Sequence, residues 1–238
     1  MQPSWLNHAG IVVPAYEAAR TLSDVVLGLR ETLPAYAEAI VVVDDGSQDD
    51  TAVVAEKLGC ETIRHPRNCG KGAALLSGFS AAKARGWDVV LTVDADGQHP
   101  ASAARDVMLA SDDPNAFVIG VRNLSRDGAP RKNRFSNAIS NFFLSRFAGR
   151  SLHDTQCGLR RYPLRETLAL GARGRGYDFE AEVLLRAAWA KKSIVHQPIA
   201  VMYPPDRTTH FDATRDPWRI VGRVVGTAIE HGFSRKQA

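Results

Sequence analysis

The chain has few cysteines and no long apolar run. Its three cysteines (Cys60, Cys69 and Cys157) are odd in number and form no CxxC pair, which favours a reducing compartment over a disulfide framework or a zinc site. No apolar run approaches the roughly 18 residues that span a bilayer. The N-terminus also lacks a basic segment followed by an apolar stretch. A secreted or integral membrane protein is therefore disfavoured.

Two common phosphate-binding motifs are also missing. The run Asn68-Cys69-Gly70-Lys71-Gly72 has some likeness to a P-loop, but residue 65 is not glycine and no Ser or Thr follows Lys71. The first apolar segment is followed by Pro14-Ala15-Tyr16-Glu17, not by GxGxxG. A P-loop NTPase and a dinucleotide-dependent dehydrogenase are therefore not supported. Internal repeats and low-complexity tracts are absent as well.

The composition is that of a folded, slightly basic protein. Of the 238 residues, 45% are hydrophobic and 24% are charged, so the chain can bury a core as one large domain, or as one domain with a short appendage. The formal net charge of +4 fits a solvated basic surface, or an anionic partner such as a nucleotide, a phosphate, a nucleic acid or an acidic lipid. Composition alone does not choose between these.

Apolar segments without polar alternation follow one another with helical patterns between them. We expect strands at 11–13, 39–43, 61–64, 89–93 and 117–121, with helices at 22–33, 51–58, 71–85 and from about residue 100. Further along we expect a loop at 122–134, helices at 135–147 and 179–189, an edge strand at 194–201, a loop at 203–217 and an amphipathic helix at 220–229. This order predicts an α/β fold with a mostly parallel open sheet and helices on both faces. Its ligands should bind just after residues 13, 43 and 93.

The clearest chemical signal is Asp94-Ala95-Asp96-Gly97-Gln98-His99-Pro100, directly after the apolar segment at 89–93. Asp, Gly and Pro also form ordinary turns. At the end of a buried strand, however, Asp94 and Asp96 can converge on one hard cation, and Gln98 offers a neutral oxygen. Such all-oxygen ligation favours Mg²⁺ or Mn²⁺.

Two further groups follow the first two expected strands. Asp44 and Asp45 begin the run Asp44-Asp45-Gly46-Ser47 and could hydrogen-bond a base N–H or a ribose hydroxyl. In Pro14-Ala15-Tyr16-Glu17, the ring of Tyr16 and the carboxylate of Glu17 could cover a base and a ribose. Turn formation and helix capping explain the residues after Gly46, but not two acidic side chains at the end of a strand.

Together and in this order, these motifs resemble the nucleotide-sugar domain of family 2 glycosyltransferases with the GT-A fold. The likeness is greatest to the dolichyl-phosphate mannose synthases and the bacterial polyprenyl-phosphate glycosyltransferases. It extends to the runs Asn68–Gly72, Asp154–Tyr162 and Tyr177–Glu180, and covers about residues 9–205. Leu159 stands where the family usually has Phe, and the stretch from Arg207 to Phe211 keeps only the arginine and hydroxyls of the family's R-x-x-G-x-S-K.

The resemblance implies a metal-dependent enzyme that transfers a sugar from a UDP- or GDP-sugar with inversion. Residues 1–205 would form its catalytic domain. Pro14, Tyr16, Glu17, Asp44, Asp45, Lys71 and Asp94 would contact the donor, and Asp94, Asp96 and Gln98 would hold Mg²⁺ or Mn²⁺ against the departing diphosphate. Lys71 or Arg207 would add positive charge there.

The acceptor decides what else the site needs. A phosphate monoester is already largely ionised at neutral pH and needs arginines for positioning, and Arg122, Arg126, Arg131 and Arg134 precede an aromatic segment at 135–147. This pattern favours a polyprenyl phosphate lying along that segment. A saccharide, lipid or small-molecule hydroxyl would instead need a general base, for which Asp154 is the best candidate.

Residues 206–238 form the expected C-terminal loop and basic amphipathic helix, which either docks on the domain or lies on an anionic membrane. We therefore expect a cytoplasmic enzyme in peripheral contact with the cytoplasmic membrane face. A nucleotidyltransferase is disfavoured because no Gly-rich, Arg-containing loop follows the first strand. A nucleic-acid partner is not expected, because the arginines are not interleaved with aromatic residues in any known binding motif.

Overall fold

The computed structural model describes the backbone of residues 3–203 and 214–237 and the side chains of residues 3–203 and 214–232. Its strands are β1 Ala9–Ala15, β2 Ile40–Asp44, β3 Glu61–Arg64, β4 Val89–Thr92, β5 Phe117–Arg122, β6 Arg160–Pro163 and β7 Ile194–Ile199. Its α-helices are α1 Leu22–Thr32, α2 Thr51–Lys57, α3 Lys71–Ala84, α4 Ala101–Met108, α5 Arg131–Ala148, α6 Leu164–Ala169, α7 Asp178–Trp189 and α8 Asp216–Gln237. Arg207 and most of the expected loop at 203–217 lie outside the described residues.

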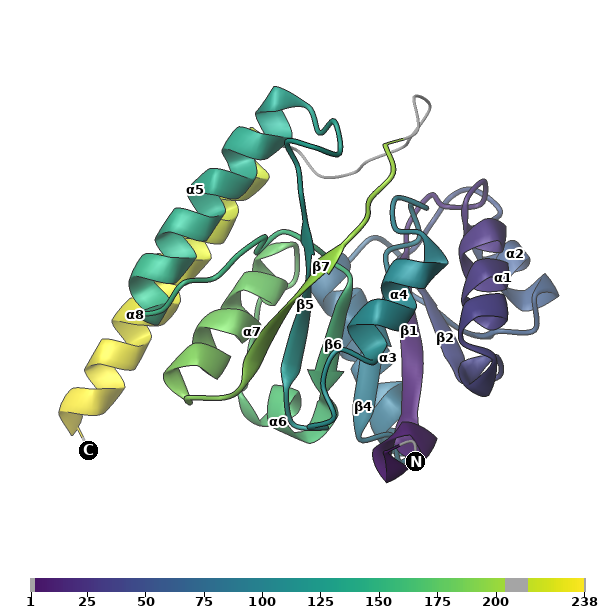
Figure 1. The fold of residues 1–238 in the computed structure, drawn as a ribbon, viewed down its shortest axis with the longest axis horizontal. Coiled ribbons are helices and arrows are strands. Elements are labelled where there is room, and N and C mark those ends of the chain that lie inside the picture. The colour runs from purple at the N-terminus through teal and green to yellow at the C-terminus, as the bar shows by residue number, and fades with distance from the viewer. Residues whose placement is uncertain (1–2, 204–213, 238) are drawn as a thin grey trace.

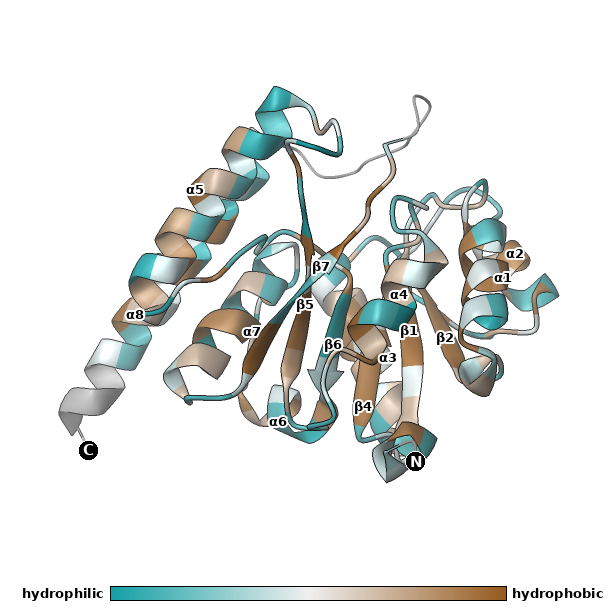
Figure 2. Ribbon diagram, in the orientation of Figure 1, coloured by the Kyte–Doolittle hydropathy of each residue, from teal (hydrophilic) through white to brown (hydrophobic). Residues whose placement is uncertain are grey.

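The described strands form one mixed sheet of seven strands in the order β3-β2-β1-β4-β6-β5-β7. All pairings are parallel except those of β6, which runs antiparallel between β4 and β5. Strands β1, β2 and β4 are buried along their whole length, which explains their unbroken apolar sequences. Figure 2 shows this hydrophobic interior. The mostly parallel sheet expected from the sequence is confirmed.

Helices cover both faces of the sheet (Figure 1). One core lies under α1 and α4 and includes Leu22, Val26 and Met108. The other lies under α3 and α7 and includes Leu75 and Phe79. Connections between parallel strands pass over one face or the other, so the loops that leave β1 and β4 diverge at the carboxyl end of the sheet. This divergence opens a crevice where a ligand can bind.

Helices α5 and α8 lie side by side at one flank of the sheet and contact each other (Figure 1). Helix α8 also contacts α7 and buries Ile220 and Val224, so one of its faces docks on the domain. No helix in the described part of the chain is both long enough and apolar enough to cross a membrane.

Strand β6 and helix α6 were not predicted from the sequence. Strand β6 carries two adjacent arginines and a proline, Arg160-Arg161-Tyr162-Pro163, a polar pattern that does not indicate a buried strand. Both arginines are nevertheless almost fully buried. Arg161 donates to the carbonyl oxygens of Met108, Ser111 and Asp113 at 2.7–2.8 Å, which offsets the cost of burying its charge.

The loop between β5 and α5 is shorter than the loop expected at 122–134. Arg122 is the last residue of β5, and α5 begins at Arg131 directly after Pro130, so Arg131 and Arg134 lie in the first turn of a helix. A proline fits well just before a helix because its φ is already suitable. Cations at a helix N-terminus are unfavourable, however, so Arg131 and Arg134 did not indicate that a helix begins here.

Candidate active site

A cleft of about 620 Å³ opens at the carboxyl ends of β1, β2 and β4. Strand β1 lies between β2 and β4, so the cleft marks the point where the chain connections of the sheet diverge. Its walls come from the segments after these strands, from α3, β5, α5 and α8, and from the segment just before α7. Of the residues expected at a site, it is lined by Pro14, Tyr16, Glu17, Asp45, Lys71, Asp94, Asp96, Gln98 and Arg122.

Asp94 and Asp96 follow β4 in a tight turn. The backbone N–H of Gln98 donates to Asp96 Oδ1 at 3.0 Å, and its side-chain amide donates to Asp96 Oδ2 at 2.7 Å. Burial, together with the negative charge of Asp94, raises the pKa of Asp96 to about 6. The two carboxylates are thus held close enough to repel each other.

Lys71, the first residue of α3, neutralises one of these carboxylates. Its Nζ lies 2.7 Å from Asp94 Oδ1 and 3.1 Å from Glu180 Oε2, and only 12% of the side chain is exposed. Burial alone would lower the pKa of Lys71, but the charges of Asp94 and Glu180 outweigh it and hold that pKa above its ordinary value. The ion pair also holds the pKa of Asp94 below its ordinary value, against the effect of burial.

The glycine of the run Asp154–Tyr162 packs directly on this ion pair. A Cβ at Gly158 would overlap the carboxylate of Asp94 and the ammonium of Lys71. Glycine is therefore required at this position by a close backbone approach.

Asp154 holds Arg122 at the wall of the cleft. Arg122 donates from Nε to Asp154 Oδ2 at 2.7 Å and from Nη2 to Oδ1 at 2.8 Å, and its backbone N–H also donates to Oδ2. Asn137 of α5 donates to Oδ1 as well. Burial would raise the pKa of Asp154, but these hydrogen bonds from Arg122 keep that pKa below its ordinary value. The carboxylate is therefore ionised and already fully engaged.

Arg160 anchors the loop that carries Asp154 and Gly158. Its guanidinium donates to the carbonyl oxygens of Thr155 and Cys157, each at 2.6 Å, and to that of Glu180 at 2.9 Å. Because these carbonyls come from the loop and from α7, one buried side chain ties both to β6. The loop geometry therefore depends on this arginine.

Of the two adjacent aspartates at the end of β2, only Asp45 lines the cleft. Asp45 Oδ1 accepts from Cys69 N at 2.9 Å, and Oδ2 accepts from Gly70 N at 2.8 Å, so Asp45 fixes the loop before α3. Asp44 is fully buried, accepts from Ser47 N and pairs with Arg64 Nε at 3.3 Å. The two side chains diverge because successive residues at a strand end point to opposite sides.

The segment after β1 reaches across to the segment after β2. The backbone N–H of Glu17 donates to Ser47 Oγ at 2.9 Å, and Glu17 Oε1 accepts from Gln48 N at 2.7 Å. Glu17 has φ 51°, an uncommon value for a residue with a side chain. These bonds hold it in that conformation, with Tyr16 and Glu17 at the cleft wall.

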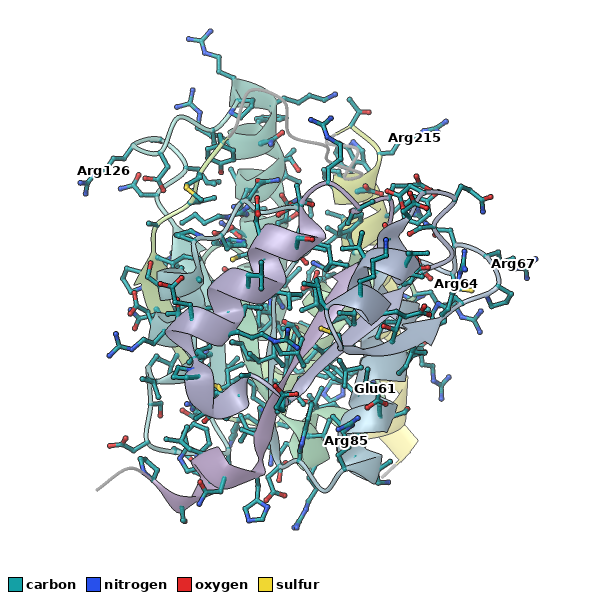
Figure 3. All side chains as sticks on the ribbon, turned by 90° about the vertical axis from the view of Figure 1, so that its right-hand side faces the viewer. Glu61, Arg64, Arg67, Arg85, Arg126 and Arg215 are labelled. Carbon is teal, nitrogen blue, oxygen red and sulfur yellow. The ribbon has the colours of Figure 1, made fainter. Side chains whose placement is uncertain are left out.

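The remaining arginines are distributed differently from our expectation. Arg126, Arg131 and Arg134 are not among the residues that line the cleft. Arg126 points outward at the end of the molecule where α5 begins (Figure 3). The sequence analysis missed Arg175, before α7, and Arg219, in α8, both of which line the cleft. No pattern pointed to them, because they reach the site only through the packing of α7 and α8.

The acidic pair is suited to a divalent cation. Lys71 pairs with Asp94, whereas among the described residues no Lys or Arg lies within ion-pair distance of Asp96. Asp96 is half-buried, its pKa is raised, and it has no cationic partner in the described part of the chain, so its charge is left for an ion to neutralise. The oxygens of Asp94, Asp96 and Gln98 suit Mg²⁺ or Mn²⁺.

A mostly parallel sheet with an acidic pair and a lysine at its carboxyl end is the arrangement expected of a GT-A glycosyltransferase. The sequence model of glycosyl transferase family 2 matches residues 10–167, and the chain belongs to this family. It is therefore an enzyme of the glycosyltransferase class.

Three curated relatives are 27–32% identical to this chain over the aligned residues. The UDP-N-acetylglucosamine–dolichyl-phosphate N-acetylglucosaminyltransferase of Methanococcus voltae is 27% identical over 81% of this chain and 85% of its own length. The polyprenol monophosphomannose synthase of Mycolicibacterium smegmatis is 29% identical over 79% and 75%. The undecaprenyl-phosphate 4-deoxy-4-formamido-L-arabinose transferase of Pseudomonas paraeruginosa is 32% identical over 68% of this chain and 49% of its own length.

Among solved structures, the fold is similar to that of the glucosyl-3-phosphoglycerate synthase of Mycobacterium tuberculosis in complex with Mn²⁺, UDP and phosphoglyceric acid. The TM-score is 0.72 at 17% identity, and the alignment covers 93% of this chain and 77% of that one. At this identity the likeness establishes the GT-A fold.

His99 makes stability depend on pH. Burial and the positive charge of Arg122 lower the pKa of His99 to about 4, whereas an unfolded histidine has a pKa of about 6.5. Between these values the unfolded chain binds more protons, so the free energy of unfolding falls as pH drops from 6.5 to 4. We predict that His99→Gln makes this decline shallower, by up to about 3 kcal/mol between pH 7 and pH 4.

Urea unfolding of both proteins at a series of pH values measures this difference. His8→Gln is the matched control, because His8 is exposed and its replacement should keep the wild-type slope. An equally steep decline in His99→Gln would contradict the prediction.

Proposed function

We propose that the chain transfers a sugar from a UDP- or GDP-sugar to a polyprenyl phosphate, with inversion and with Mg²⁺ or Mn²⁺ as cofactor. The proposal rests on the pair formed by Asp154 and Arg122. Asp154 holds the positively charged guanidinium of Arg122 at the wall of the cleft that contains Asp94 and Asp96. Such a site suits an acceptor that is itself an anion.

On the donor side, this chain has to hold a diphosphate whose negative charge grows as the sugar leaves. Asp94, Asp96 and Gln98 would hold the divalent ion, which neutralises part of that charge when bound. Lys71 adds a permanent positive charge beside Asp94. Asp45 fixes the loop at 68–70, and Tyr16 and Glu17 close the adjoining wall, where we place the nucleoside.

On the acceptor side, the state of Asp154 favours a phosphate over a hydroxyl. A general base needs an available oxygen and a pKa near the working pH. Asp154 has neither, because Arg122 and Asn137 occupy its oxygens and its pKa is lowered. A phosphate monoester is already ionised and needs no base.

Arg122 is well placed to bind such a phosphate. A guanidinium has five N–H donors, and the edge formed by Nε and Nη2 faces Asp154. Among the described residues, no hydrogen bond is made by the N–H groups of Nη1 or by the second N–H of Nη2, and we assign these donors to a ligand. We further assign Arg175 and Arg219, which also line the cleft, to the binding of anionic groups of the substrates. The names of the curated relatives, which act on dolichyl, polyprenol or undecaprenyl phosphates, support this assignment.

The surface of α5 and α8 suits a lipid chain and a membrane. Phe135 and Phe142 lie seven residues apart, on one face of α5, and are 70% and 66% exposed. Trp218 and Ile229, three turns apart on α8, are 61% and 54% exposed. Arg126 and Arg215, which precede α5 and α8, point outward on opposite sides of the molecule in Figure 3. We therefore propose peripheral contact with the cytoplasmic face of an anionic membrane.

The acceptor proposal predicts a selective effect of Arg122→Gln. Loss of the charged hydrogen bonds should raise the KM for polyprenyl phosphate by about 10- to 100-fold and change the KM for the nucleotide sugar much less. Radiolabelled sugar transfer to purified polyprenyl phosphate measures both constants. Arg105→Gln is the matched control, because Arg105 is exposed, does not line the cleft and lies on α4, away from α5 and α8.

Circular dichroism establishes that each variant is folded, and Arg122→Lys provides a second variant that keeps the charge without the paired geometry. Transfer by the wild type to free sugars or alcohols, with none to polyprenyl phosphate, would overturn the acceptor assignment.

The membrane proposal predicts that replacing both Phe135 and Phe142 by serine weakens binding to vesicles of phosphatidylglycerol and phosphatidylcholine by at least about tenfold, because two exposed rings lose their apolar burial. Co-sedimentation at several lipid concentrations measures this change. Leu27→Ser, at a residue of α1 that is 52% exposed, should bind as the wild type does. Equal binding by all three proteins would contradict the prediction.

A further inference from the structure

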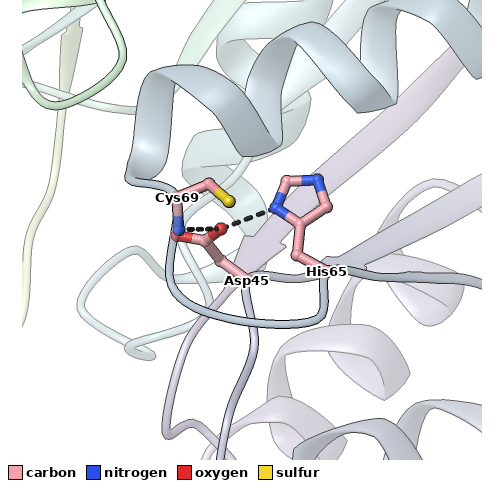
Figure 4. A group of neighbouring side chains, drawn as sticks. All are labelled: Asp45, His65 and Cys69. Atoms are coloured by element: carbon pink, nitrogen blue, oxygen red, sulfur yellow. Dashed lines mark hydrogen bonds and ion pairs between the residues drawn. The ribbon is translucent and has the colours of Figure 1, made fainter.

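Three potential metal ligands meet at the wall of the cleft, away from the Asp94–Asp96 pair. Asp45 follows β2, His65 follows β3, and Cys69 lies in the loop before α3 (Figure 4). One ligand atom from each lies within 4.8 Å of the others. Asp45 is 3% exposed, and the side chain of His65 is 13% exposed. The ends of the neighbouring strands β2 and β3 therefore place a carboxylate oxygen and an imidazole nitrogen close to the sulfur of Cys69.

Neighbouring groups already orient the histidine and the carboxylate. His65 Nδ1 lies 2.6 Å from Asp45 Oδ1, and His65 Nε2 lies 2.9 Å from Ser77 Oγ on α3. The backbone N–H groups of Cys69 and Gly70 donate to the two oxygens of Asp45. Such outer partners are what metal sites use to fix the direction of a ligand.

We propose that Asp45, His65 and Cys69 form a second metal site, selective for Zn²⁺ and similar borderline-soft ions. A thiolate, an imidazole and a carboxylate are three typical zinc ligands, and the fourth position is left to water or to a ligand in the cleft. The all-oxygen group of Asp94, Asp96 and Gln98 suits harder ions. The two sites therefore differ in chemistry as well as in place.

On binding, the Cys69 thiol releases its proton to solvent and the thiolate takes up the ion. His65 binds the ion through Nδ1 as the neutral tautomer that carries its proton on Nε2, and this Nε2–H donates to Ser77 Oγ. Asp45 can keep its backbone hydrogen bonds, because a carboxylate has about four acceptor positions.

The site has a regulatory consequence that rests on the proposed function. Asp45 and Cys69 line the same cleft as Pro14 and Tyr16, where we place the nucleoside of the donor. An ion bound there changes the charge and the free volume of that wall. Zinc should therefore weaken donor binding while Asp94 and Asp96 remain intact.

A Co²⁺ titration without nucleotide tests the site itself. Cobalt bound to a thiolate gives a near-ultraviolet charge-transfer band, which an all-oxygen site cannot produce. We expect this band in the wild type and in Cys60→Ser, whose thiol lies in the core, and its loss in Cys69→Ser. Zn²⁺ affinity, measured by competition with a chromophoric chelator, should fall roughly 10- to 100-fold in Ser77→Ala, which removes only the partner of His65.

A Co²⁺ complex without the band, or a band that survives in Cys69→Ser, would overturn the proposal. Calorimetry of UDP and GDP at increasing Zn²⁺ tests the consequence, with weaker nucleotide binding expected in the wild type and less weakening in Cys69→Ser. If zinc binds and nucleotide affinity does not change, the regulatory role is excluded and the site remains. Because the cobalt band requires no nucleotide, failure of the proposed function leaves that result unaffected.

Discussion

The half-buried ion pair between Lys71 and Asp94, shared with the buried Glu180, is the interaction on which the site depends. It joins the start of α3, the end of β4 and the first turn of α7, three segments that are far apart in the sequence. Buried ion pairs stabilise a fold less than apolar packing of the same volume would. Its more direct consequence is electrostatic: Lys71 neutralises Asp94 and leaves Asp96 for another cation.

A second pair, Asp154 with Arg122, is built in the same way on the other side of the cleft. Arg160 fixes the loop that carries Asp154, and Gly158 in that loop packs against Asp94 and Lys71. The two pairs are therefore held in one rigid frame. A donor site and an acceptor site need such a frame, because displacement requires the reacting groups to be aligned.

Sequence reasoning was most successful where one physical pattern dominates. Strands β1, β2 and β4 are apolar, and acidic residues stand at or just after their ends, so both the sheet and the position of the cleft could be predicted. Strand β6 could not, because Arg160 and Arg161 are buried by hydrogen bonds to distant carbonyls. The sequence does not show that Asp45 lines the cleft while Asp44 is buried, because this depends on the direction of each side chain. It also does not show that Arg175 and Arg219 line the cleft, because this depends on how the helices pack.

Calorimetric titration of UDP and GDP with and without Mn²⁺ tests whether Asp96 is left for a divalent cation while Lys71 neutralises Asp94. We expect Mn²⁺ to tighten the binding of one of these nucleotides to the wild type. Asp96→Ala, shown to be folded, should lose this gain and keep the weaker metal-free binding. An equal gain from Mn²⁺ in Asp96→Ala would contradict this expectation.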